Sequence, residues 1–203
     1  MMGKISLENV SRETIERLRE FEQLALKWTK KINLVSAGDA SQIWERHIVD
    51  SVQIYDLAPS EGDWLDIGSG GGFPGIVAAI IAKERMPDRS FTLVDSDQRK
   101  CAFLRTANRE LGLNVKVLAE RVEKMLPAGA QVLSARALDD LNSLLDHADR
   151  HLSKAGVSLF PKGSQWERED EEARKHWSYN LEVIKSETNP EATILKIKEL
   201  KRV

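Results

Sequence analysis

The stretch that most constrains the fold of this chain is a short apolar run followed by a glycine-rich loop. Trp64–Ile67 has the composition of a buried strand, and the next five residues, Gly68–Gly72, include four glycines. Pro74 then precedes an apolar run over 76–82, and proline suits the first turn of a helix. Glycines let a backbone approach a ligand closely and adopt positive φ. This order predicts a strand, a tight turn and a helix, with a nucleotide-type ligand at the turn.

The charge at this loop narrows the choice of ligand. Gly70-x-Gly72-x-x-Gly75 matches the dinucleotide fingerprint, which alone is a weak signal. The glycines already begin at Gly68, however, and Asp66 lies two residues before it. A carboxylate there repels a pyrophosphate but suits S-adenosylmethionine, which carries a sulfonium, an ammonium and no phosphate. Asp66-x-Gly68-x-Gly70 resembles the first motif of methyltransferases that use this ligand. We therefore expect these three residues to bind it, with Asp66 near the ammonium.

The rest of the chain alternates strands and helices. Strands are expected at 91–95, 115–118, 132–135 and 157–160, helices at 97–111, 138–152 and 164–177, and a closing antiparallel pair at 181–184 and 193–197. Strands separated by helices imply a mostly parallel sheet. We predict a Rossmann-like α/β fold of the S-adenosylmethionine-dependent methyltransferase type. Its sheet is seven-stranded and mostly parallel, with an antiparallel terminal hairpin.

The first 60 residues predict helices. Apolar residues recur every three or four positions from Ser11 to Ile32, and Ser11 is the expected N-cap. A second helix, capped by Asp39 or Ser41, carries apolar residues as far as Tyr55. We expect residues 1–60 to be a helical extension packed on an α/β core at 61–203, so that 1–203 is one methyltransferase domain.

Two further segments are expected to hold the adenosine part of the ligand. The second strand ends at Asp95, 20 residues after Gly75, where a carboxylate accepts hydrogen bonds from ribose hydroxyls. Asp95 is also a candidate N-cap, and its ribose role does not distinguish S-adenosylmethionine from NAD. After the third strand, Val122 is expected on the adenine ring face, with backbone groups of Val122 and Glu123 at its polar edge.

Three cationic or titratable residues have two interpretations each. Arg136 directly follows the fourth strand, where α/β sheets carry their chemistry, although a charged residue there is otherwise solvated. Arg46 and His47 belong to a polar insert, 46–51, within the second helix. They form either a solvated face or a rim beside the ligand pocket that meets phosphate.

Composition indicates the compartment and the partners. The single cysteine, Cys101, excludes an internal disulfide and fits a reducing compartment. No apolar run approaches the ~20 residues of a membrane helix, and the N-terminus lacks a signal-peptide core. We expect a cytoplasmic monomer with no metal and no membrane contact. The net charge is −2, so an RNA surface requires a local basic patch. Candidates are Arg46, Arg136, Lys162 and the basic ending Lys196, Lys198, Lys201 and Arg202.

Several motifs together resemble one family, RsmG (GidB), whose bacterial members methylate guanine N7 in 16S ribosomal RNA. The matching motifs are Trp28-x-x-x-Ile32-Asn33-Leu34, Arg46-His47-Ile48-x-Asp50-Ser51, Asp66–Gly75, Asp95-Ser96, Arg121-Val122-Glu123, Ser134-Ala135-Arg136-Ala137 and Lys162-Gly163. Minor departures occur at Gly71 and Ala135. The resemblance implies S-adenosylmethionine as cofactor and the 16S rRNA of the small ribosomal subunit as partner.

The resemblance also implies roles for individual residues. Gly68 and Phe73 contact the cofactor, and Arg136 lies at its edge. Val122 and Glu123 hold the adenosine portion. Arg46 and His47 become residues of the RNA face.

The implied chemistry needs positioning more than proton transfer. Guanine N7 has a lone pair and the sulfonium methyl is electrophilic, so no general base is required, and in-line positioning supplies roughly 7–11 kcal/mol. No strictly catalytic residue is therefore expected. Arg136, Lys162, Arg46 and His47 are positioning candidates: Arg136 for the guanine or the methionine carboxylate, Arg46 and Lys162 for RNA phosphate. A small-molecule methyltransferase and an NAD-binding regulatory or redox protein remain the alternatives.

Overall fold

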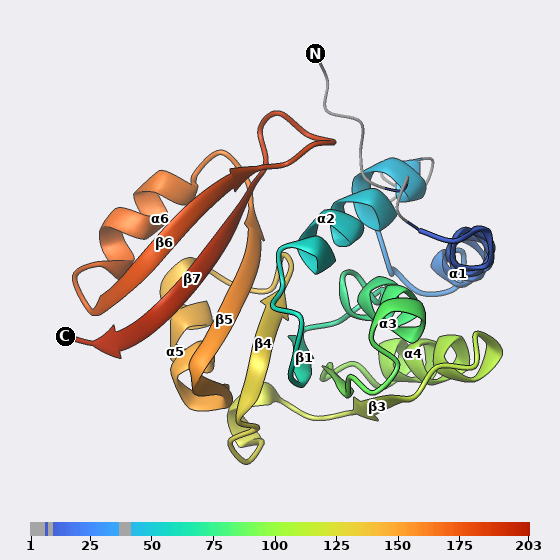
Figure 1. Ribbon diagram of the computed structural model, residues 1–203, viewed down its shortest axis with the longest axis horizontal. Coiled ribbons are helices and arrows are strands. Elements are labelled where there is room, and N and C mark those ends of the chain that lie inside the picture. Colours follow the sequence, from blue (N-terminus) through green and yellow to red (C-terminus); the bar gives the residue numbers. More distant parts are fainter. Residues whose placement is uncertain (1–6, 8–9, 37–41) are drawn as a thin grey trace.

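The computed structural model describes residues 7, 10–36 and 42–203, and a seven-stranded sheet lies at its centre (Figure 1). The strands are β1 (Trp64–Ile67), β2 (Phe91–Val94), β3 (Val115–Leu118), β4 (Ala130–Ala135), β5 (Leu152–Lys162), β6 (Trp177–Lys185) and β7 (Thr193–Arg202). Their order is β3-β2-β1-β4-β5-β7-β6. The first five are parallel, and β7 runs antiparallel to both of its neighbours. The predicted fold class is confirmed.

Helices cover both faces of this sheet. They are α1 (Arg12–Thr29), the π-helix η3 (Trp44–Val49), α2 (Asp50–Asp56), α3 (Gly75–Arg85), α4 (Gln98–Glu110), the 3₁₀ turn η4 (Val122–Lys124), α5 (Leu141–His151) and α6 (Trp166–Ala173). In Figure 1, α1 to α4 gather at one side of the sheet and α5 and α6 at the other. Each group encloses its own hydrophobic core against the sheet.

The N-terminal helices pack on the α/β core through aromatic side chains. Ser11 caps α1 as predicted, because its hydroxyl accepts a hydrogen bond from the Thr14 backbone N–H at 3.2 Å. Phe21, on the apolar stripe, is fully buried, and its ring centroid lies 5.3 Å from that of Phe73 and 6.2 Å from that of Phe103. Asp39 and Ser41, the alternative caps of the second helix, lie outside the described residues.

Several element boundaries differ from the sequence-based expectation, and three of the differences have a clear cause. The second N-terminal helix is not uniform, because the π-helix η3 precedes α2. Helix α6 ends at Ala173 rather than 177, and Trp177 begins β6. Trp177 and Tyr179 are buried while Ser178 and Asn180 are exposed. This alternation is typical of a strand, but the charged residues before it made the segment resemble the end of a helix. Strand β5 is also longer than the expected 157–160, since its edges pair with β4 and β7.

Within the described residues, no helix is long and apolar enough to cross a membrane. The same part of the chain contains no group of three His, Cys, Asp or Glu side chains arranged to hold a metal ion.

Candidate functional site

The glycine loop turns sharply at the carboxyl end of β1. Gly68, Gly70 and Gly72 have φ of 62°, 50° and 79°, which glycine adopts without steric cost. The turn is closed by the N–H of Ser69, which donates to the carbonyl of Val94 at 3.0 Å, and by that of Gly72, which donates to the carbonyl of Ser69 at 2.7 Å. Pro74 is the N-cap of α3 rather than its first residue. The loop therefore places backbone groups at the carboxyl ends of β1 and β2, the edge of the sheet where α/β proteins bind ligands.

Asp95 supports this loop from the end of β2. Its Oδ2 accepts a hydrogen bond from the Gly70 N–H at 2.8 Å, and its Oδ1 accepts one from the Asp97 N–H at 2.8 Å. The N-cap of α4 is Asp97, so the alternative capping role for Asp95 is wrong. A carboxylate has about four acceptor positions, which leaves room for a ribose hydroxyl at each oxygen.

Asp66 lies beneath the loop, with only 1 % of its surface exposed. Its Oδ1 accepts a hydrogen bond from the Ser134 hydroxyl at 2.5 Å, and that hydroxyl accepts one from the Trp64 indole at 2.8 Å. A Cβ on Gly75 would lie 2.6 Å from Oδ2, so α3 begins directly against the carboxylate. Burial raises the pKa of Asp66 to about 6, against the lowering effect of the Ser134 hydrogen bond. Its contact with a methionine ammonium stays a prediction.

A cleft of about 250 Å³ opens beside the loop, and we call it the loop cleft. Its lining residues are Gly68, Val94, Asp95, Ser96, Lys100, Glu120, Arg121, Val122, Glu123, Ala137 and Leu138. Four residues predicted to bind the cofactor, Gly68, Asp95, Val122 and Glu123, thus come together from separate strand ends. Sequence reasoning missed Lys100 and Leu138, although the rule that ligands bind at carboxyl strand ends points to both segments.

Helix α5 supports the side of the loop cleft that carries Val122 and Glu123. The Nε2 of the buried His151 lies 3.2 Å from the carbonyl oxygen of Val122. Burial lowers the pKa of His151, which favours the neutral ring, and its Nε2–H donates a hydrogen bond to this carbonyl. Arg150 donates to the carbonyl of Met125 at 2.7 Å. The turn η4, which carries Val122 and Glu123, is therefore fixed before any ligand arrives.

Four predicted cofactor residues do not line the loop cleft, and one of them, Arg136, lines the second cleft described below. Asp66 is buried beneath the loop, and the backbone N–H of Gly70 is bonded to Asp95. Phe73 is 7 % exposed and packs between Phe21 and His47, whose ring centroid is 5.1 Å from its own. The structure thus places Phe73 between the N-terminal helices and the loop, and its predicted cofactor contact stays a prediction.

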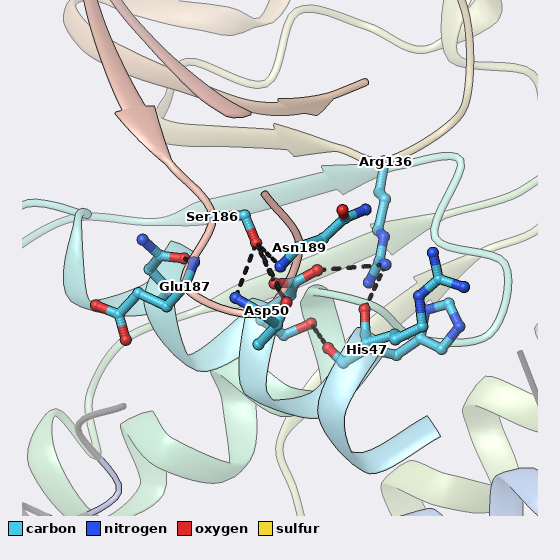
Figure 2. A network of polar contacts seen from close by, with 10 residues as sticks. His47, Asp50, Arg136, Ser186, Glu187 and Asn189 are labelled. Carbon is cyan, nitrogen blue, oxygen red and sulfur yellow. Dashed lines mark hydrogen bonds and ion pairs between the residues drawn. The ribbon is translucent and has the colours of Figure 1, made fainter. Parts of the chain in front are cut away.

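A second cleft of about 290 Å³, the rim cleft, adjoins the first at Ala137. Its lining residues are Arg46, His47, Asp50, Arg136, Ala137, Leu144, Pro161, Lys162, Gly163, Asn189 and Ala192. All four positioning candidates therefore lie together. Two hydrogen bonds fix the position of Lys162, because its Nζ donates to Glu169 Oε2 and to the Asp139 carbonyl, each at 2.7 Å. Arg136 donates from Nη2 to the Arg46 carbonyl at 2.6 Å (Figure 2).

The basic ending does not form one patch with the rim cleft. Thr193 pairs with Lys162 near the clefts, and β7 runs from there toward the opposite end of the sheet. Lys196 pairs with Glu182 at 3.6 Å, and Arg202 pairs with Asp146 on α5. Arg202 therefore does not form one patch with Arg136 and Lys162, because an antiparallel strand carries it away from the rim cleft, and its contact with RNA stays a prediction.

The residues of the loop cleft fit S-adenosylmethionine. Three carboxylates, Asp95, Glu120 and Glu123, outnumber the cationic Lys100 and Arg121 in its lining, which favours a cationic ligand over a pyrophosphate. Gly68 leaves the floor open, since a Cβ there would lie 2.6 Å from Cδ1 of Leu138.

Solved structures share this architecture. The TYW2 protein of M. jannaschii, solved with AdoMet, aligns with a TM-score of 0.61 at 15% identity over 86% of this chain and 80% of that one. A SAM-dependent methyltransferase from Aquifex aeolicus gives a TM-score of 0.60 at 16% identity, over 85% and 97%. At such identities the likeness concerns the fold alone.

Sequence relatives identify the family. The family model described as rRNA small subunit methyltransferase G matches residues 14–194. The "Ribosomal RNA small subunit methyltransferase G" of Ruegeria sp. (strain TM1040) is 52% identical over 99% of this chain and 98% of its own length. The protein of the same name from Gluconobacter oxydans (strain 621H) is 45% identical over 97% and 100%. Both the matched range and the full-length identity lead to one conclusion: the chain belongs to the GidB family, rRNA small subunit methyltransferase G.

Proposed function

We propose that this protein transfers the methyl group of S-adenosylmethionine to N7 of a guanine in the 16S rRNA of the small ribosomal subunit. Family membership makes the chain a small-subunit rRNA methyltransferase. The choice of guanine as the methylated base, and of N7 as the methylated atom, is our proposal. The observation that carries it is the pair of clefts joined at Ala137. One has an excess of carboxylates for a cationic cofactor, and the other has Arg46, Arg136 and Lys162 for an anionic acceptor.

Positioning by these residues accounts for the reaction. The cofactor supplies an electrophilic methyl group when bound. Asp95, Val122 and Glu123 orient its adenosine part, and Arg136 orients the guanine from the rim cleft. Because N7 has a lone pair in the plane of the ring, nothing has to remove a proton from it. Holding donor and acceptor in line supplies roughly 7–11 kcal/mol of the barrier.

The surroundings of Cys101 support nitrogen rather than cytosine C5 as the acceptor. C5 methylation requires a thiolate next to the base. Cys101 is the single cysteine of the chain, is fully buried in α4 and lies 3.2 Å from the Asp95 carbonyl, to which its thiol donates. Burial raises the pKa of this thiol, which opposes formation of the nucleophile.

We also propose the compartment, the oligomeric state and the domain organisation of the protein. It is a cytoplasmic monomer, and residues 1–203 form one methyltransferase domain in which the 1–60 extension completes the site. The position of Arg46 and His47 in the rim cleft supports this role for the extension.

Methyl transfer onto ribosomal subunits that lack the modification tests the proposal. With tritiated S-adenosylmethionine, we expect label in 16S rRNA, at one guanine N7 revealed by base-specific chain cleavage. Arg136→Ala is expected to lower the transfer rate at least tenfold, whereas Arg12→Ala, whose side chain is 87% exposed on α1, is expected to leave it unchanged. Label in a metabolite or in protein, or tight binding of NADH alone, would overturn the proposal.

A further inference from the structure

Asp50 links two parts of the chain that sequence order keeps far apart. Its Oδ2 lies 3.7 Å from Nη2 of Arg136, at the end of β4. Its Oδ1 accepts hydrogen bonds from the hydroxyls of Ser186, at 2.9 Å, and of Thr188, both in the turn between β6 and β7. Figure 2 shows the carboxylate between the arginine and this turn. One side chain of α2 therefore contacts both.

The turn, residues 186–189, is ordered by the same contacts and by α2. The Ser186 hydroxyl oxygen accepts from the backbone N–H groups of Thr188 and Asn189, at 3.2 and 3.1 Å. One helical turn after Asp50, Gln53 donates to the Lys185 carbonyl at 2.9 Å and accepts from the Glu187 N–H at 3.1 Å. The tip of the terminal hairpin is thus fixed on α2.

Arg136 is held on the same helical segment by a second contact. Its Nη2 also donates to the Arg46 carbonyl at 2.6 Å. That carbonyl lies in the π-helix η3, a form often found at functional sites. The side chains of Arg136 and Asp50 are only 20% and 14% exposed, so their attraction is less screened than that of a surface pair.

These contacts bear on the rim cleft, because the turn forms part of its wall. Asn189 and Ala192 line this cleft together with Arg136 and Lys162. A hydrogen bond from the Ala192 N–H to the Asn189 carbonyl, at 3.0 Å, holds the two wall residues together. Displacement of Asp50 would therefore shift the arginine and the opposite wall at once.

We propose that Asp50 is a positioning residue for methyl transfer. Its two carboxylate oxygens fix Arg136 and the turn 186–189 relative to each other, so that the terminal hairpin forms part of the site for the acceptor guanine. This inference rests on the function proposed above.

Two variants separate the two halves of this contact. In Asp50→Asn, the amide oxygen still accepts from Ser186 and Thr188, but the charge that faces Arg136 is lost. In Ser186→Ala/Thr188→Val, the turn loses its hydroxyls and the Asp50–Arg136 ion pair remains. Asp56→Asn is the matched control, because Asp56 lies on the same helix and pairs with Arg85 at 2.7 Å, outside the lining of both clefts.

In steady-state methyl transfer to unmodified subunits, we expect the two variants to affect different kinetic constants. Asp50→Asn should lower kcat at least tenfold with KM for the subunit within twofold, since misplacement by about 1 Å costs up to 10²-fold. Ser186→Ala/Thr188→Val should raise that KM at least fivefold with a smaller change in kcat. Both should bind S-adenosylhomocysteine within twofold of the wild type by calorimetry, and Asp56→Asn should match the wild type throughout.

A double-mutant cycle tests whether Asp50 acts through Arg136. In single turnovers with excess enzyme, Asp50→Asn should lower the rate no further in an Arg136→Gln background. Losses that multiply, or an unchanged kcat in Asp50→Asn, would overturn the proposal. If Asp50→Asn unfolds at the assay temperature, an unchanged KM in the folded turn variant overturns it instead. Failure of the wild type to methylate subunits would refute the proposed function itself, which distinguishes the two failures.

Discussion

Replacement of the buried Asp66 by asparagine tests the electrostatics beneath the loop. Burial raises the pKa of this carboxyl from 3.8 to about 6. That rise corresponds to ~3 kcal/mol. Because the folded protein holds this proton more tightly than the unfolded chain, protonation of Asp66 stabilises the fold at low pH. The contribution is lost as the pH rises from about 4 to about 6, and above that range it no longer changes.

The difference between wild type and Asp66→Asn isolates this effect. Asparagine does not titrate, and its different contacts with Ser134 add an offset that is independent of pH. Every other titrating group is common to both proteins. The unfolding free energy of the wild type minus that of the variant, from urea titrations, is therefore expected to fall by ~2 kcal/mol between pH 4 and pH 7. A flat difference across this range would refute burial as the cause of the raised pKa.

The same pair of proteins tests the predicted ammonium contact. If the ligand ammonium binds the charged carboxylate, protonation of Asp66 competes with binding. The wild-type affinity for S-adenosylhomocysteine should then weaken about tenfold from pH 7 to pH 5, while that of Asp66→Asn should be lower at pH 7 and vary less. Equal pH profiles for the two proteins would place the ammonium elsewhere.

Five further substitutions, two of them controls, address packing, loop conformation and the buried hydrogen bonds. Phe21→Ala should lower the unfolding free energy by about 3–5 kcal/mol and keep one calorimetric transition, whereas two transitions would contradict a single domain. Gly68→Ala, at φ 62°, should weaken S-adenosylhomocysteine binding at least fivefold, whereas Gly129→Ala, at φ 64° with open space around its Cβ position, should cost stability and leave binding unchanged. Ser134→Ala should cost about 1–3 kcal/mol in urea unfolding, and Ser158→Ala, whose buried hydroxyl has no hydrogen-bond partner among the described residues, should cost much less.

The parts of the fold that depend on local patterns were predictable from the sequence. Trp64–Ile67, the glycines after it and the apolar start of α3 specify a strand, a turn and a helix within a dozen residues. Their order along the chain then fixes which strand ends meet, so that Gly68, Asp95, Val122 and Glu123 were assigned to one site without knowledge of any contact. This assignment was possible because the carboxyl ends of parallel strands lie at the same edge of the sheet.

The parts that depend on contacts between distant segments were not predictable. Asp50 was recognised within a motif, but its partners Ser186 and Thr188 lie more than 130 residues away. No pattern in 186–189 indicates that this turn reaches α2. The same limit applies to Arg202. The sequence did not show that the direction of β7 separates this residue from the rim cleft.

The residue that separates the two clefts explains how one strand end serves both. Ala137 has φ 50°, a left-handed conformation that costs a non-glycine residue free energy and occurs often at functional sites. The residue before it, Arg136, lines the rim cleft, the residue after it, Leu138, lines the loop cleft, and Ala137 lines both. In a continued strand, Arg136 and Leu138 would point to the same face of the sheet, because they are two positions apart. The left-handed Ala137, two residues beyond the end of β4, interrupts that alternation, and the two side chains line different clefts. The two clefts, to which we assign the cofactor and the acceptor, therefore meet at the backbone of a single residue.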